Sequence, residues 1–253
     1  QAAGAEYVIV LNASPFRAGI QAARRKAASR AGVPLAYVNA VGGQDDLVFD
    51  GRSFVQSATG ETLAELPLAE EAVVVCDWRQ TGFRPPAPTD SEIWRRILVV
   101  GIRDFIDGLG LPSVVLGLSG GIDSAVVACL ATEALGPDRV TPVSLPSRFT
   151  SELSESSASE LAQALGLTLQ VIPLEPLHAA AKAALEGLPG RCTGLVDENL
   201  QARLRMSLLM AWVNRLGGML LNTSNKTELS LGYGTLYGDM AGGLSPLGDL
   251  TKP

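Results

Sequence analysis

The sequence predicts an α/β protein built in two parts, and three observations support that prediction. Beyond residue 110, strand-like apolar runs alternate with helical segments, and two strands with the helix between them fit into about 30 residues, the length of a βαβ unit. The crossover rule makes such strands parallel, so this part is expected to form a doubly wound parallel sheet. Before residue 80, a strand and a helix are followed by several strands in series, which favours a layered α/β sandwich. A proline-rich stretch separates the two parts.

The first part is expected to contain five strands and one helix, each with a local signal. Short runs rich in β-branched residues mark the strands, and an Ala-rich segment that ends at Gly32 marks the helix. Gly60 is expected at a hairpin turn, and the basic cluster at residues 24–26 on the solvated face of the helix. The expected strands are residues 7–11, 35–41, 47–51, 53–56 and 72–77, and the expected helix is residues 18–31.

The second part opens with a helix and continues as alternating strands and helices. Thr89 and Glu92 are capping residues for the first helix, whose apolar residues from Trp94 to Phe105 recur at helical spacing. Ligands of doubly wound sheets bind beyond the carboxyl ends of the strands. Strands are expected at residues 114–118, 140–145, 168–172 and 218–223, and further helices at 125–135, 154–165 and from 197 on.

Residues 119–124, Ser-Gly-Gly-Ile-Asp-Ser, connect a buried strand to the helix that follows it. Gly120 and Gly121 lack a Cβ, so the backbone can turn sharply and approach a ligand closely. The helix N-terminus offers unpaired N–H groups and a partial positive charge, which favour a phosphate. Because Asp123 would repel a bare phosphate, its carboxylate implies Mg²⁺ between the two. A glycine-containing turn with capping residues is the alternative that needs no ligand.

Two later segments carry polar residues that suit a nucleotide site. Thr223, at the end of a predicted strand, can donate to a nucleotide, and Glu228 can supply a second carboxylate for Mg²⁺. A helix cap with a glutamate in its first turn is the plain alternative. Asn199 and Arg203 lie four residues apart and share one helix face, which is usually the solvated side of a helix.

The composition bounds the class of protein. The 253 residues are 47% hydrophobic and 18% charged, as in a globular chain with an ample core, and a net charge of −6 argues against nucleic acid as a partner. No apolar run reaches about 18 residues and no signal peptide is recognisable, so no membrane partner and a cytoplasmic location are expected. Three widely spaced cysteines form no metal or disulfide pattern. His178 is the only histidine, and a capping or surface role is expected for it.

The loop at residues 119–124 lacks the Gly-Lys-Ser/Thr ending of a Walker A motif and resembles the pyrophosphate-binding loop of the ATP pyrophosphatases. Those enzymes cleave ATP between the α and β phosphates and adenylate a substrate. Three further segments are similar to the glutamine-dependent NAD synthetases of that superfamily. They are Glu-Asn-Leu-Gln-Ala-Arg-Leu-Arg from residue 198, Thr-Ser-Asn-Lys-Thr-Glu from residue 223 and Tyr-Gly-Thr-Leu-Tyr-Gly-Asp from residue 233.

This resemblance implies roles for individual residues. Asp123 and Glu228 would hold Mg²⁺ as the cofactor, with ATP as co-substrate. The ATP contacts that it implies are Gly117, Leu118, Ser119, Gly120, Gly121, Ile122, Asp123, Ser124, Thr223 and Lys252. The contacts with deamido-NAD (nicotinic acid adenine dinucleotide) that it implies are Asn199, Glu228, Tyr233, Gly234, Thr235 and Leu236.

The first part resembles the C-terminal half of a nitrilase-type glutaminase domain, with an αββα sandwich. The similar segments are residues 12–16, 38–45 and 49–53, within a match that covers residues 1 to about 78. The family's nucleophilic cysteine precedes the strand at 7–11, so no glutaminase catalytic residue is expected in this chain. The expected domains are 1–88, the nitrilase-like part with its linker, and 89–253, an adenine nucleotide α-hydrolase-like synthetase domain, the chain being truncated at both ends.

The function implied is ATP-dependent amidation of deamido-NAD to NAD through an adenylate, with ammonia supplied from glutamine in the whole protein. The resemblance also implies a homo-oligomer with an interface shared between synthetase domains. Two alternatives stay open at this point. One is another adenylating ATP pyrophosphatase, similar to GMP synthetase, and the other is a non-catalytic segment that binds a nucleotide.

Overall fold

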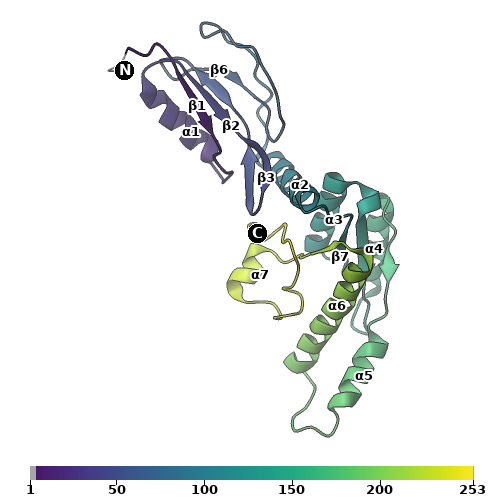
Figure 1. The fold of residues 1–253 in the computed structure, drawn as a ribbon. Coiled ribbons are helices and arrows are strands. Elements are labelled where there is room, and N and C mark those ends of the chain that lie inside the picture. Colours follow the sequence, from purple (N-terminus) through teal and green to yellow (C-terminus); the bar gives the residue numbers. More distant parts are fainter. Residues whose placement is uncertain (1–3, 253) are drawn as a thin grey trace. The chain divides into compact units, whose positions relative to one another are not determined.

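The computed structural model describes residues 4–252 and divides into two compact units, one up to Phe105 and one from Ile106 on (Figure 1). Helix α2 (Asp90–Gly108) runs across that boundary. No helix in the described part of the chain combines the length and the apolar character needed to cross a membrane.

Unit 1 is built on a four-stranded sheet with the order β1-β2-β5-β6. β1 and β2 are parallel and the other neighbours antiparallel, while β3 and β4 form a separate hairpin. The predicted turn at Gly60 is confirmed, because its φ is +86° and it joins β5 to β6. The elements are β1 (Val8–Asn12), α1 (Ile20–Ala28), a 3₁₀ turn (Ser29–Ala31), β2 (Leu35–Asn39), β3 (Val41–Gln44), β4 (Leu47–Asp50), β5 (Phe54–Gln56) and β6 (Thr62–Glu65).

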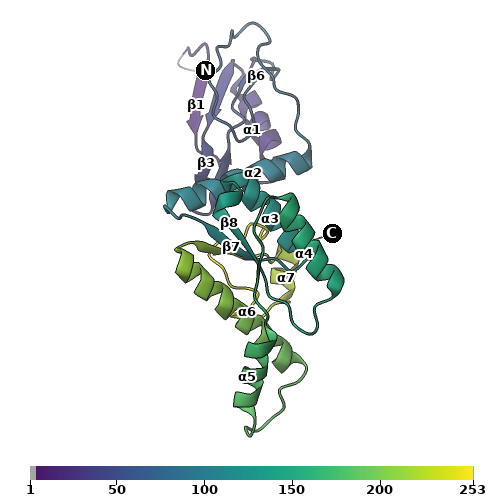
Figure 2. The ribbon, with the colours of Figure 1, turned by 90° about the vertical axis from the view of Figure 1, so that its right-hand side faces the viewer.

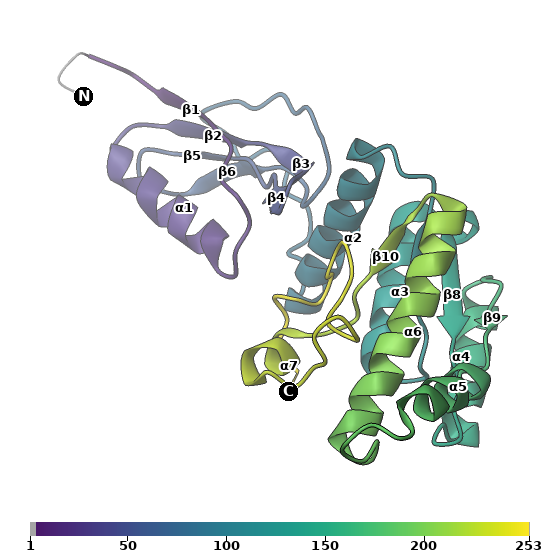
Figure 3. The same ribbon diagram turned by 60° about the horizontal axis from the view of Figure 1, so that its bottom comes forward.

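The two faces of this sheet differ. Helix α1 lies along one face (Figure 3), where Leu35, Tyr37 and Phe54 form a buried cluster with Ala28 of the helix. Alternation along the strands turns Ile9, Leu11 and Val38 to the opposite face, where they are 60%, 79% and 44% exposed. An apolar face of the sheet is therefore left open.

Two expectations for unit 1 are wrong. Residues 72–77 form no strand in the described structure, and Val73 and Val75 are 99% and 98% exposed. A β-branched run needs a neighbouring strand to satisfy its backbone, and none pairs with it there. Arg24 does not lie on a solvated face but is 5% exposed, because its guanidinium reaches inward to the buried Asp50.

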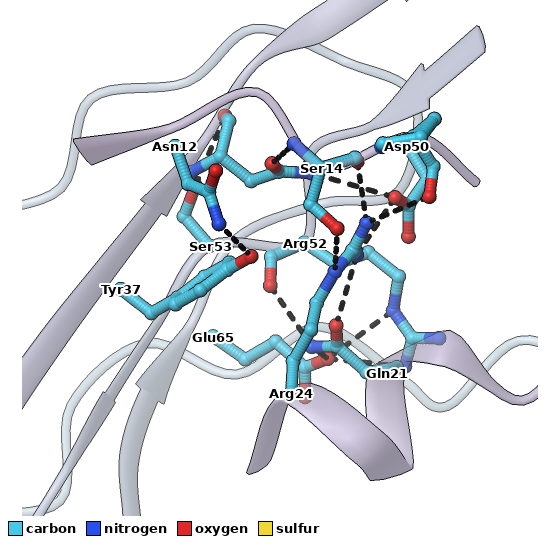
Figure 4. A network of polar contacts seen from close by, with 11 residues as sticks. Asn12, Ser14, Gln21, Arg24, Tyr37, Asp50, Arg52, Ser53 and Glu65 are labelled. Atoms are coloured by element: carbon cyan, nitrogen blue, oxygen red, sulfur yellow. Dashed lines mark hydrogen bonds and ion pairs between the residues drawn. The ribbon is translucent and has the colours of Figure 1, made fainter. Parts of the chain in front are cut away.

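Figure 4 shows the network around Arg24. Its Nη1 donates to Oδ1 of Asp50 at 2.8 Å, and its Nε and Nη2 donate to Oγ and the carbonyl of Ser14 at 3.1 and 2.7 Å. Asn39 also donates to the Asp50 carboxylate, at 3.5 Å. Arg24 thus ties helix α1 to the loop after β1 and to the end of β4.

Unit 2 confirms the predicted parallel sheet, with the order β10-β7-β8-β9 and every neighbouring pair parallel. The chain leaves β7 toward β8 and β9 and then returns to the other side of β7 with β10. The elements are β7 (Val114–Gly117), α3 (Ile122–Leu135), a 3₁₀ turn (Pro137–Arg139), β8 (Val140–Ser144), α4 (Glu152–Ala164), β9 (Gln170–Val171), α5 (Glu175–Leu185), α6 (Leu195–Leu216), β10 (Met219–Leu221) and α7 (Lys226–Leu231).

Helices cover both faces of this sheet. Right-handed crossovers place α3 and α4 on one face and α6 on the other, and Figure 2 shows α4 and α6 on opposite sides of β7 and β8. Val115, Val143 and Leu220 of the sheet form one buried cluster with Leu209 and Val213 of α6. The reversal of strand order between β7 and β10 is a topological switch point, where doubly wound sheets bind ligands.

Candidate functional site

A cavity of about 340 Å³ lies in unit 2 at the carboxyl ends of the strands, beside the switch point. Among its lining residues, Gly117 ends β7 and Ser119 follows it, Ser144 ends β8, and Asn222 and Thr223 follow β10. The structure thus brings Thr223 to the same cavity as Gly117, Leu118 and Ser119, as the sequence predicts. Arg205 of α6 also lines it, and burial lowers the pKa of its guanidinium.

The loop between β7 and α3 is held by its own hydroxyls. Oγ of Ser119 lies 3.1 Å from Oγ of Ser124, and Ser124 donates to the carbonyl of Gly121 at 2.9 Å. Ser124 is buried in the first turn of α3, against this loop. Gly120 has a φ of +80°, and Gly121 at the N-cap has no side chain with which to cap α3. The first N–H groups of α3 are thus left for another acceptor.

A cluster of charged groups surrounds Asp123 in the first turn of α3. Lys252 Nζ lies 2.7 Å from its Oδ2, and Nδ2 of Asn225 donates to its Oδ1 at 3.4 Å. The hydrogen bond to Asp123 raises the pKa of the Lys252 ammonium above its usual range, and the charge of Glu228 adds to the effect. Residues that are 102 and 129 positions away in the sequence therefore converge on one carboxylate.

Glu228 reaches this cluster through the N-terminus of α7. Asn225 and Glu228 form a capping box, in which Oδ1 of Asn225 accepts from the N–H of Glu228 and Oε2 of Glu228 accepts from the N–H of Asn225, each at 3.1 Å. The helix cap, which was the alternative for Glu228 at the level of sequence, is thus present, and Asn225 connects it to Asp123.

The donor set suits a hard divalent cation that shares its ligands with a nucleotide. Mg²⁺ is usually bound through one or two carboxylates together with phosphate oxygens and water. The described residues contain no group of three acidic, histidine or cysteine side chains that could hold a metal without a ligand's help. Asp123 and Glu228, tied together by Asn225, therefore fit a metal that arrives with a polyphosphate.

The second predicted group, on α6 and the glycine-rich loop after α7, is also brought together. Thr235 donates its hydroxyl to Oδ1 of Asn199 at 2.7 Å, and Nε of Arg203 donates to the carbonyl of Leu236 at 3.1 Å. The side chains of Tyr233 and Leu236 remain exposed. Gly234 lies beside them, and a Cβ there would come within 2.6 Å of Cγ of Met240.

Sequence reasoning missed Asn222, whose buried amide uses all four of its hydrogen-bonding positions. Nδ2 donates to the carbonyls of Asp239 and Ala241 at 2.9 and 3.0 Å. Oδ1 accepts from the N–H of Ser224 at 2.7 Å and from the hydroxyl of Ser245 at 3.2 Å. Through these bonds Asn222 holds residues 239–245 of the glycine-rich segment against the end of β10. Its only sequence signal is a polar residue directly after an apolar strand.

The expected capping or surface role of His178 is wrong, because its side chain caps neither α5 nor α6. The side chain is fully buried, and Nε2 lies 2.8 Å from Oδ1 of Asp197 at the start of α6. Lys182, one turn further along α5, lies 3.0 Å from the same oxygen. Hydrogen bonds from Lys182 and then from His178 lower the pKa of Asp197 below its usual range. This group joins α5 to α6.

Comparison with known proteins decides the family. The sequence model of the NAD synthase family matches residues 94–253, more than half of the chain. The chain belongs to this family. It is 47% identical to a glutamine-dependent NAD(+) synthetase of Rhodobacter capsulatus over 99% of its own length, and 37% identical to one of Thermotoga maritima over 98%. It spans about half the length of these relatives, 48% and 51%.

Solved structures of the family agree with the fold. A glutamine-dependent NAD+ synthetase from Acinetobacter baumannii in complex with ADP superposes with a TM-score of 0.95 at 38% identity, covering 99% of this chain and 50% of that one. An NH3-dependent NAD synthetase from Campylobacter jejuni reaches a TM-score of 0.60 at 35% identity and covers 65% of this chain and 69% of its own.

Proposed function

We propose that unit 2 amidates deamido-NAD to NAD at the expense of ATP, through an adenylated substrate. The observation that supports this most strongly is the convergence of Asp123, Asn225, Glu228 and Lys252 beside an uncapped helix N-terminus at the switch point of the sheet. The geometry suits a magnesium-bound polyphosphate. The similar Acinetobacter enzyme was solved with ADP, an adenine nucleotide of the same class.

In this proposal, the loop at residues 119–124 is a pyrophosphate-binding loop of the ATP-pyrophosphatase kind. The N–H groups at the start of α3 receive phosphate oxygens, and the cavity beside Thr223 receives the rest of the nucleotide. Mg²⁺ bound between Asp123 and Glu228 would neutralise charge on the leaving pyrophosphate. Lys252, which forms an ion pair with Asp123, would add a positive charge close to the bound phosphates. Catalysis is then mostly positioning and charge neutralisation.

The acceptor is proposed to approach from the side of α6 and the glycine-rich loop. Asn199, held by Thr235, and the exposed Tyr233 and Leu236 offer polar and apolar contacts for a dinucleotide. The nicotinate carboxylate attacks the α-phosphate and releases pyrophosphate. Ammonia then attacks the carboxyl carbon and releases AMP.

A second copy of the chain is proposed to pack on α6, so that the dinucleotide site is shared between two synthetase units. Large apolar side chains at both ends of this helix are exposed, among them Leu195, Val196, Met210 and Leu216. A second copy packed along α6 would cover these side chains. Sedimentation equilibrium should therefore give a dimer or a larger symmetric oligomer.

Unit 1 is proposed to be the C-terminal half of a nitrilase-like αββα sandwich, with residues 1–88 in this domain and its linker and 89–253 in the synthetase domain. The sheet is covered by α1 on one face and exposes Ile9, Leu11 and Val38 on the other. A second sheet and helix layer packed on that face would complete the sandwich. The glutaminase residues that release ammonia from glutamine would then lie outside this chain.

The test is to incubate the chain with Mg-ATP, deamido-NAD and ammonium and to measure AMP and NAD together. Equal amounts of the two are expected, and Asp123→Asn should abolish both while circular dichroism stays unchanged. AMP that forms equally without deamido-NAD would point to another acceptor, such as that of a GMP synthetase-like enzyme, or to hydrolysis of ATP by water. Nucleotide binding without either product would leave only a binding role.

A further inference from the structure

Asn225 has a side chain that is bonded at both ends, and this distinguishes it from an ordinary helix cap. It is buried, with 3% of its surface exposed. Oδ1 accepts from the N–H of Glu228, and Nδ2 donates to Oδ1 of Asp123. Its backbone N–H in addition holds Oε2 of Glu228. One residue therefore touches both carboxylates.

Capping alone does not require this residue type. A helix N-cap needs only a side-chain acceptor, and serine or aspartate supplies one about as well as asparagine. Aspartate has no donor and the single hydroxyl of serine lies at the acceptor position, so only asparagine among these caps has a separate N–H donor that reaches a second carboxylate. The donor is the part of Asn225 that reaches Asp123, on an element more than 100 positions earlier in the chain. The choice of asparagine is thus explained by Asp123 rather than by α7.

The bonds of Asn225 restrict both carboxylates at once. At Asp123, Oδ1 is held by the amide and Oδ2 faces Lys252, so rotation of the carboxyl group breaks a bond at each oxygen. At Glu228, Oε2 is held by the backbone of the capping box. Partners outside the ligand shell of a metal commonly orient the ligands in this way, and they strongly affect metal affinity.

We propose that Asn225 is a positioning residue that sets the separation and orientation of Asp123 and Glu228 for a divalent cation bound with a nucleotide. The proposal rests on the proposed function of this site, because it presumes that the cation and the nucleotide bind there together. Asn225 itself touches neither the phosphates nor the reacting atoms. Its effect passes through the two carboxylates.

Two substitutions separate positioning from capping. Asn225→Ser keeps an acceptor for the N–H of Glu228 and loses the Nδ2 donor to Asp123, because its one hydroxyl lies at the acceptor position. Asn225→Ala loses both. The readout is Mn²⁺ affinity in the presence of α,β-methylene-ATP, measured by electron paramagnetic resonance of free Mn²⁺, together with the thermal midpoint of each variant. Asn225→Thr gives the same comparison with more side-chain volume if the serine variant does not fold.

The serine variant should unfold close to the wild-type temperature and yet bind Mn²⁺ about tenfold more weakly. The alanine variant should show the same loss of affinity and a lower midpoint. Wild-type affinity in the serine variant would overturn the positioning role, because the cap alone would then suffice. If the wild-type chain takes up no Mn²⁺ with the nucleotide, both this proposal and the proposed function are overturned.

Discussion

Gly120 is the position at which a single added methyl group should most destabilise the loop at residues 119–124. Its φ is +80°, and an added Cβ would overlap the carbonyl oxygen of Ser154 in α4 while lying 2.8 and 2.9 Å from Cα and C of that residue. The left-handed conformation costs a residue with a Cβ about 1–2 kcal/mol. The obstacle is backbone, so side-chain rotation gives no relief, and overpacking adds about 1–3 kcal/mol.

Gly120→Ala should therefore lower the free energy of unfolding by about 2–5 kcal/mol, or the thermal midpoint by roughly 4–20 °C. Gly121→Ala is the matched control. Its Cβ would meet only Oγ of Ser119, at 3.3 Å, and its φ of −83° is ordinary, so a loss under about 1 kcal/mol is expected. Circular dichroism melting gives the midpoints, and hydrogen exchange of the β7 and α3 peptides reports unit 2 separately. Equal stability of the two variants would refute the idea that the loop is pressed against α4.

Two further predictions concern ion pairs, of which the first is buried and the second partly exposed. Arg24→Met should lower the free energy of unfolding by about 3–5 kcal/mol, because it leaves the buried Asp50 carboxylate without its cation. The double variant Arg24→Met, Asp50→Leu should lose much less of this free energy, as measured by urea denaturation. Additive losses from the two substitutions would contradict the pairing. Asp197→Asn should lower the free energy of unfolding by about 1–3 kcal/mol at neutral pH. Folding lowers the pKa of Asp197, so the extra stability of the wild type over Asp197→Asn is present above the usual carboxyl pKa and should vanish as the pH falls through the lowered pKa. A stability difference that stays constant with pH would contradict this role of Asp197.

The features of this protein that could be predicted are those that depend on local sequence patterns. The parallel sheet follows from alternating strands and helices, and the loop at residues 119–124 follows from two glycines between an apolar strand and an Ala-rich helix. The stretch at 72–77 shows the limit of the same reasoning. Its β-branched residues are as strand-like as those of β7, but a strand also needs a neighbour, which local composition does not reveal.

The contacts that make the site join residues far apart in the chain. Neither the position of Lys252 against Asp123 nor that of Asn225 between two carboxylates follows from spacing, because the segments meet only after β10 returns beside β7. Family resemblance supplied the candidates, but not the bonds between them. Burial of Arg24 was missed for a related reason, since its partner Asp50 lies 26 residues away on another element.

The central claim is that the acceptor is adenylated on its carboxylate at the site around Asp123. The most direct test uses deamido-NAD labelled with ¹⁸O in the nicotinate carboxyl group, together with Mg-ATP and ammonium. Attack of that carboxylate on the α-phosphate and later displacement by ammonia leave one of its oxygens on the released AMP. Mass spectrometry should therefore find one ¹⁸O in the phosphate of AMP for each NAD formed. NAD that forms together with unlabelled AMP would contradict the account.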